Sequence, residues 1–138
     1  MRRRQKTSLG RNGIGKMQYF LDTYALIEIA TQNPKYSNYS INPIGAGTTI
    51  FNIMEIHLYY LKNFGIEEAE KIYGLVSPLL ISTDDDVIKD ANKFKLANLK
   101  KRFSFADCIG YVTALKLNAK FVTGDYAFKG MENVEFVR

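Results

Sequence analysis

Cysteine, proline and tryptophan are scarce in this 138-residue chain, which contains one cysteine, three prolines and no tryptophan. A single cysteine, Cys108, cannot form a disulfide within the chain, and no Cys/His cluster has the spacing of zinc ligands. No apolar run approaches the ~20 residues that cross a bilayer, and the basic N-terminus lacks the apolar stretch of a signal peptide. We therefore exclude a disulfide-rich secreted domain, a zinc finger and a membrane-spanning helix, and expect a cytoplasmic protein.

Length and composition are typical of one folded domain. A chain of 138 residues is long enough to bury a core without disulfides or metals. Hydrophobic residues make up 46% and charged residues 24% of it, which argues against disorder and collagen-like repeats.

Positive charge is concentrated at the N-terminus. Residues 1–16 contain six of the 19 basic residues and no acidic one, which leaves 13 basic against 14 acidic residues in 17–138. Because residues 1–16 are glycine-rich and lack hydrophobic periodicity, we predict a flexible basic arm followed by the domain proper over 17–138. Two explanations of the arm stay open: salt-sensitive contacts with phosphates, or an extension that precedes a true start at Met17.

Short apolar strands alternate with helical patterns along 17–138. The run 17–22 predicts a strand that leads into a helix, whereas Asn-Pro pairs and glycines predict a loop over 31–47. Further helices are expected over 51–63, 66–77, from Thr83 toward Leu99, and over 105–117, with short strands over 79–81, 120–123 and 133–137. Strands separated by helices predict a single α/β domain with a mostly parallel sheet and helices on both faces.

Four acidic residues stand where such a sheet would gather them. Asp22 ends the first strand and Asp125 follows the FVT strand, so both should lie at the edge formed by the carboxyl ends of the strands. Asp107 lies in the first turn of a helix, and Glu55 lies within an otherwise apolar one. Each has a structural explanation, since the aspartates suit helix starts and Glu55 could face solvent or pair with Lys62. Together, however, they would repel one another unless a cation neutralised them.

The cations that suit this set are Mg²⁺ and Mn²⁺. Both bind carboxylate and water oxygens, and both leave coordination positions for phosphate. Two such ions can activate water for in-line attack and stabilise the leaving oxygen. The acidic set therefore indicates phosphodiester hydrolysis without a nucleophilic side chain.

Five segments also resemble a known family. The segments FLDTYALIE, NIMEI, SFADCIGYVTALKLNA, FVTGDYAF and NVEFV are similar, in order and spacing, to the signature segments of PIN-domain ribonucleases, which include VapC-type toxins. The resemblance implies a PIN-like fold and metal-dependent RNA hydrolysis by acidic residues that bind Mg²⁺ or Mn²⁺. The residues that match the acidic positions are Asp22, Glu55, Asp107 and Asp125. Two hydroxyl residues beside them, Thr23 and Thr123, match positions that orient ligands.

The family implies partners as well as an activity. We expect an endoribonuclease that acts on RNA; if it is a toxin, a small antitoxin would cover the acidic groove and a homodimer would form. Alternatives are a PIN nuclease of RNA processing, a catalytically silent RNA-binding module, and a Mg²⁺-dependent phosphoryl acceptor. The basic stretch ending in Lys100, Lys101 and Arg102 could guide RNA or simply face solvent. His57 and Cys108 are interpreted as structural.

Overall fold

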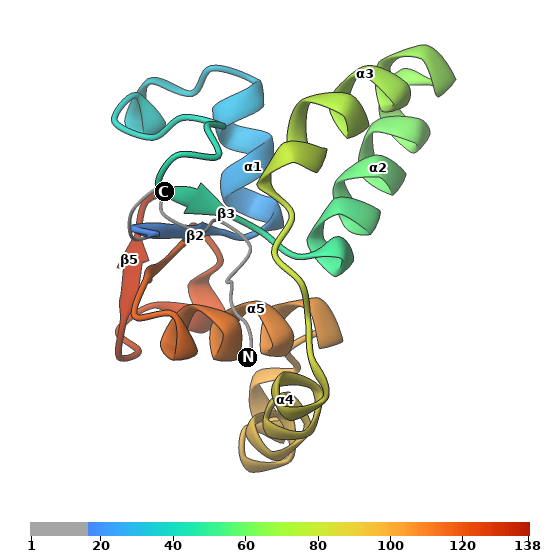
Figure 1. The fold of residues 1–138 in the computed structure, drawn as a ribbon. Coiled ribbons are helices and arrows are strands. Elements are labelled where there is room, and N and C mark those ends of the chain that lie inside the picture. Colours follow the sequence, from blue (N-terminus) through green and yellow to red (C-terminus); the bar gives the residue numbers. More distant parts are fainter. Residues whose placement is uncertain (1–16) are drawn as a thin grey trace.

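The computed structural model describes residues 17–138, so the predicted basic arm over 1–16 lies outside the described residues. Along the described chain, α1 lies between β2 and β3, the helices α2 to α5 lie between β3 and β4, and β5 follows β4 (Figure 1). The strands are β2 (Tyr19–Leu21), β3 (Ala46–Gly47), β4 (Lys120–Thr123) and β5 (Val134–Phe136). The helices are α1 (Thr23–Ala30), α2 (Ile50–Phe64), α3 (Ile66–Val76), α4 (Asp85–Ala97) and α5 (Phe105–Lys116). Short 3₁₀ turns are η1 (Pro34–Tyr36), η2 (Ser77–Leu79), η3 (Leu99–Lys101) and η4 (Tyr126–Phe128).

The four strands form one parallel sheet in the order β3-β2-β4-β5. In the central pair, Leu21 of β2 lies opposite Val122 of β4. The chain leaves β2 toward β3 on one side, while β4 and β5 lie on the other side, so the strand order reverses between β2 and β4. The predicted α/β fold with a parallel sheet is confirmed. In open α/β sheets, ligands bind outside the carboxyl ends of the strands at such a reversal of strand order.

Alternate residues of the central strands point to opposite faces of the sheet. Phe20 and Phe121 pack into a core with residues of α4 and α5, and this core includes the fully buried Cys108. Leu21 and Val122 belong to a second core with residues of α1, α2 and α3. Figure 1 shows the same division, with α1, α2 and α3 on one side of the sheet and α4 and α5 on the other.

Helix α5 is held against the sheet by its start and by a glycine. Ser104 and Asp107 form a reciprocal capping box: the Asp107 amide donates to the Ser104 hydroxyl oxygen at 3.0 Å, and the Ser104 amide donates to the Asp107 carboxylate at 2.8 Å. A Cβ added at Gly110 would lie 2.8 Å from Cε1 of Phe20, so close approach of α5 to β2 requires a residue without a side chain. The helix ends at Lys116, and Asn118 (φ 55°) turns the chain toward β4.

One prediction about local structure was wrong, and two held except at their boundaries. Residues 79–81 form no strand but a single bridge between Thr48 and Leu80, because Leu79 still belongs to the turn η2 and this segment pairs only through Thr48. The predicted loop over 31–47 contains η1 and ends in β3, which is held by its pairing with β2. The helix expected from Thr83 begins two residues later, because the Asp84 side chain accepts from the Val87 amide (2.9 Å) and caps it; it ends before Leu99, which opens η3.

No helix among the described residues is long and apolar enough to cross a membrane.

Candidate functional site

A cavity of about 440 Å³ lies at the carboxyl ends of β2 and β4. Its lining residues come from the start of α1, from α2, from the start of α5 and from the two segments that follow β4 and β5. They are Asp22, Thr23, Tyr24, Glu55, Ser104, Asp107, Asp125 and Arg138. The structure thus brings the four acidic residues singled out in the sequence to one cavity, at the reversal of strand order.

Thr123 connects two of the four acidic residues. Its hydroxyl is hydrogen-bonded to the Asp22 carboxylate and accepts a hydrogen bond from the Asp125 amide at 3.0 Å. Asp22 also caps α1 by accepting from the Ala25 amide at 2.8 Å, and Asp125 caps η4 by accepting from the Ala127 amide at 3.0 Å. Both aspartates therefore cap the helical segment that follows them, and both also line the cavity.

Glu55 is held by a chain of polar side chains from α1 and α2. The Thr23 hydroxyl donates to Oε1 of Glu55 at 2.6 Å and accepts from Nδ2 of Asn52 at 3.2 Å. Asn52 is buried, and its Oδ1 accepts from the Thr49 hydroxyl at 2.7 Å. Because these bonds fix the direction of the carboxylate, Glu55 points toward the cavity and not into solvent.

Asp107 interacts electrostatically with each of the other three acidic residues. Its carboxylate accepts from the Ser104 amide in the capping box, which fixes its rotamer. Its negative charge acts on both Asp22 and Glu55, and the charge of Asp125 acts on Asp107 in turn. A change at Asp107 therefore alters the electrostatics of the whole set.

Burial and mutual repulsion make the negative charge of the cavity costly. Burial raises the pKa of Asp22 from 3.8 to about 7, although the Thr123 hydroxyl opposes this rise, and the charges of Asp107 and Asp125 raise it further. Burial, followed by the charge of Asp107, also raises the pKa of Glu55. The pKa of Asp107 rises for the same reasons, with burial first and the Asp125 charge after it. A cation in the cavity would offset these costs.

The donor set suits a hard divalent cation but does not enclose one. Among residues 17–138, no group of three or more Asp, Glu, His or Cys side chains is arranged to hold a metal ion by itself. The cavity nevertheless offers four carboxylates and the hydroxyls of Thr23, Tyr24 and Ser104, which are the oxygen donors that Mg²⁺ and Mn²⁺ prefer. Mg²⁺ is commonly bound by one or two carboxylates, with water and phosphate completing its coordination. The residues fit an ion of that kind.

The predicted RNA-binding residues lie outside the cavity wall. Nζ of Lys101 donates to the Ala127 carbonyl at 2.9 Å, while Lys100 and Arg102 are exposed around η3. None of the three belongs to the described cavity lining. His57 lies between α2 and α3, with Nε2 3.7 Å from the carboxylate of Glu70, so the structure gives it a packing role.

Sequence reasoning missed three residues of this region. Asn52 precedes Glu55 by three residues on the same helix, and this spacing was a usable signal for a supporting residue. Tyr24 and Arg138 line the cavity, but they are far apart in the sequence and meet only in the fold. No local pattern around Arg138 indicates a functional role.

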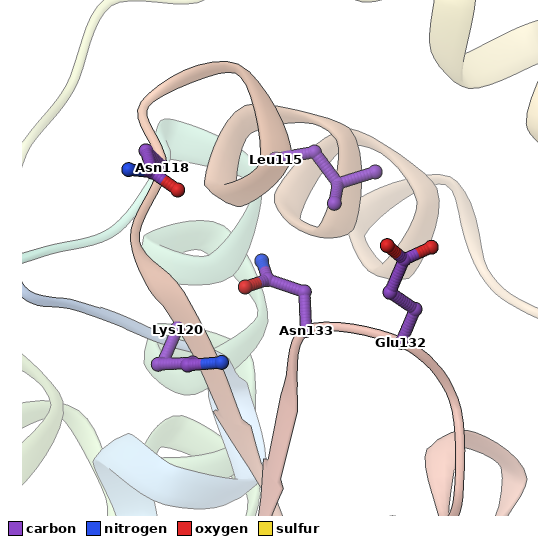
Figure 2. Close-up of a pocket in the computed structure, with 5 residues that line it drawn as sticks. All are labelled: Leu115, Asn118, Lys120, Glu132 and Asn133. Atoms are coloured by element: carbon purple, nitrogen blue, oxygen red, sulfur yellow. The ribbon is translucent and has the colours of Figure 1, made fainter.

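A second, smaller hollow of about 210 Å³ lies at the opposite end of β4. Figure 2 shows its lining residues, contributed by the end of α5, the start of β4 and the turn before β5. They are Leu115, Asn118, Lys120, Glu132 and Asn133. Nδ2 of Asn133 donates to the Ala119 carbonyl at 2.8 Å, so that side chain serves the local turn. This hollow lies at the amino end of the strands and contains none of the predicted site residues.

Comparison with solved structures yields several similar folds, whereas no family model and no curated protein sequence matches the chain. A toxin-antitoxin complex from Klebsiella pneumoniae matches with a TM-score of 0.67 and 16% identity, over 86% of this chain and 96% of that chain. DNA-bound VapBC from Salmonella typhimurium matches with a TM-score of 0.68 and 16% identity, over 87% of this chain and 96% of that chain. VapBC2 from Rickettsia felis, bound to a promoter DNA fragment, matches with a TM-score of 0.67 and 18% identity, over 88% of this chain and 100% of that chain. The fold is therefore one found in VapBC toxin-antitoxin structures, and the predicted fold class is confirmed.

Proposed function

We propose that the chain is a PIN-domain endoribonuclease that hydrolyses RNA phosphodiester bonds with Mg²⁺ or Mn²⁺, as the toxin of a toxin-antitoxin pair. The observation that carries the proposal is the meeting of Asp22, Glu55, Asp107 and Asp125 on one cavity wall. Their positions match the acidic segments that resemble PIN-domain ribonucleases, and the fold occurs in toxin-antitoxin complexes.

In this proposal the carboxylates hold the ion, and the neighbouring hydroxyls hold the carboxylates. Thr123 fixes Asp22 and the Asp125 backbone, Thr23 fixes Glu55, and the capping box fixes Asp107. When bound, the ion supplies activation of water for in-line attack and stabilisation of the leaving oxygen. Because no group of carboxylates among residues 17–138 encloses an ion, we infer that the substrate phosphate contributes to its binding.

The surface of α2 supports a protein partner. Four apolar residues on α2, spaced three or four apart, form a stripe in which every side chain is at least 38% exposed. They are Ile50, Met54, Leu58 and Leu61. Glu55 lies on the same helix, so an antitoxin that covered this stripe would also approach the acidic cavity. The homodimer implied by the family is part of this proposal, and light scattering on the purified chain tests it.

Incubation of the protein with a mixed RNA pool tests the proposed activity. We expect cleavage in Mn²⁺ or Mg²⁺, no cleavage in EDTA, and no cleavage by Glu55→Gln, because the amide removes one oxygen charge from the cavity. Glu67→Gln is the matched control, since Glu67 is exposed in the first turn of α3 and should leave cleavage unchanged. Equal cleavage by wild type and Glu55→Gln would contradict the proposal.

One observation favours a second candidate, a catalytically silent RNA-binding module. Three closely placed ligands would favour the nuclease over this module, and residues 17–138 contain no such group. A calorimetric Mn²⁺ titration separates the two candidates. The nuclease predicts saturable binding that Asp107→Asn abolishes, whereas the silent module predicts RNA binding without saturable Mn²⁺ binding.

A further inference from the structure

Arg138 is fixed on the wall of the acidic cavity. Its Nη1 donates to the Gly124 carbonyl at 2.8 Å, and its guanidinium carbon lies 4.2 Å from the ring centre of Tyr126 and 5.5 Å from that of Tyr24. A Cβ added at Gly124 would lie 2.6 Å from the Val137 carbonyl oxygen, so this close approach requires glycine. The guanidinium is therefore oriented by one hydrogen bond and two rings, next to the acidic set.

This guanidinium forms no direct ion pair with the described carboxylates around it. Among the described residues that line the cavity, Arg138 alone is basic, and none of the ion pairs within 17–138 includes it. A guanidinium has five N–H donors, and the hydrogen bond to Gly124 uses one nitrogen. Positive charge and donors thus remain available at the edge of a cavity whose other charged groups are acidic.

We propose that Arg138 binds a backbone phosphate of the RNA strand and so seats the strand in the acidic cavity; this rests on the proposed function. Four carboxylates repel a phosphodiester, so a strand enters more readily where a fixed positive charge offsets that repulsion. The planar fork of a guanidinium matches two phosphate oxygens. Because Tyr126 and Tyr24 already restrict the Arg138 side chain, little further side-chain entropy is lost on binding.

A role in charge alone makes a different prediction for Arg138→Lys. If Arg138 served only as a counter-charge for the acidic residues, Arg138→Lys would bind RNA as tightly as wild type, because the positive charge is kept. Both roles predict tighter Mn²⁺ binding by Arg138→Gln, because a positive charge beside the cavity is lost. Phosphate binding by the planar fork predicts instead that Arg138→Lys recovers only part of the RNA affinity.

The test compares wild type with Arg138→Gln, Arg138→Lys and Lys62→Gln, the last a matched loss of one positive charge in the last turn of α2. The probe is a fluorescein-labelled, mixed-sequence single-stranded RNA of twelve nucleotides, followed by anisotropy with Ca²⁺ present at several KCl concentrations. For Arg138→Gln we expect about tenfold weaker binding and a salt slope smaller by about 0.7. Arg138→Lys should keep the slope and recover part of the affinity, and Lys62→Gln should match wild type.

A parallel Mn²⁺ titration distinguishes failure of this inference from failure of the proposed function. If wild type binds both Mn²⁺ and RNA while Arg138→Gln retains wild-type RNA affinity and salt slope, the role of Arg138 is refuted and the nuclease proposal stands. If wild type binds neither, both proposals fall. Equal losses of RNA affinity in Arg138→Gln and Lys62→Gln would show that Arg138 acts only as one of many surface charges, and would overturn the inference.

Discussion

Replacement of Asp22 by asparagine should stabilise the metal-free protein, although it removes a carboxylate from the proposed site. Asp22 is only 4% exposed, and burial raises its pKa from 3.8 to about 7. Asparagine is as good a helix cap as aspartate, and its Oδ1 can accept from the Ala25 amide as the carboxylate does. The substitution therefore removes a buried charge and preserves the start of α1.

The magnitude and its pH dependence follow from the pKa. Because the pKa of Asp22 is higher in the folded than in the unfolded chain, the native state binds this proton more tightly. Its contribution to stability therefore falls as the pH rises from about 4 to about 7, and is constant above that range. At about 1.4 kcal/mol per pKa unit, the raised pKa of Asp22 destabilises the fold, relative to an unperturbed carboxyl group, by roughly 4 kcal/mol at pH 8 and roughly 2 kcal/mol at pH 5. The new amide donors cost roughly 1–3 kcal/mol, so we expect a net gain of about 1–3 kcal/mol at pH 8 and little at pH 5.

Urea denaturation in EDTA at both pH values measures this effect. The control is Asp84→Asn, because Asp84 caps α4 in the same way but is exposed, and this variant should match wild type at both pH values. In Mn²⁺, wild type should become more stable than Asp22→Asn, since only wild type gains stability from the bound ion. A variant Asp22→Asn that is less stable than wild type at pH 8, or equally stabilised at both pH values, would refute the reasoning.

Three further substitutions test other parts of the argument. Asp107→Asn should abolish Mn²⁺-dependent cleavage yet raise the urea midpoint in EDTA, because Asp107 acts on the other acidic residues; an active variant would contradict the site. Gly110→Ala should lower the free energy of unfolding by about 1–3 kcal/mol through its clash with Phe20, whereas Gly74→Ala, which meets no atom, should raise it by about 0.5–1 kcal/mol. Ser104→Ala should cost about 1 kcal/mol and slow cleavage, because the capping box orients Asp107; an unchanged rate would separate the cap from catalysis.

Most of the fold could be predicted from local patterns. The strand at 120–123 was predicted from a short run that precedes a Gly-Asp turn, and the helix after Ser104 from a capping box; the structure contains both with the predicted starts. The strand predicted over 79–81 was wrong because this segment pairs only through Thr48, which lies about thirty positions earlier in the sequence. Long-range pairing of this kind leaves no periodic signal in a short segment.

The meeting of the acidic residues in one cavity was predictable because the sheet topology constrains their positions. Parallel strands bring their carboxyl ends to one edge, so Asp22 and Asp125 could be placed together from strand positions alone, and the cavity contains both. The position of Arg138 was not predictable. Its neighbours Tyr24 and Tyr126 come from α1 and η4. Only the packing of the segment after β5 against the end of β4 brings the three together.

A comparison of two helix caps argues that the acidic cavity is functional. Asp22 and Asp84 accept the same hydrogen bond from the amide three residues ahead, at 2.8 and 2.9 Å. Asp84 does so in solvent, whereas Asp22 does so buried, with its pKa raised and two further aspartates acting on it. Capping therefore explains the hydrogen bond of Asp22 but not its burial among like charges. A costly arrangement that local structure does not require is typical of sites kept for chemistry, and this supports the acidic cavity as the place where the chain acts.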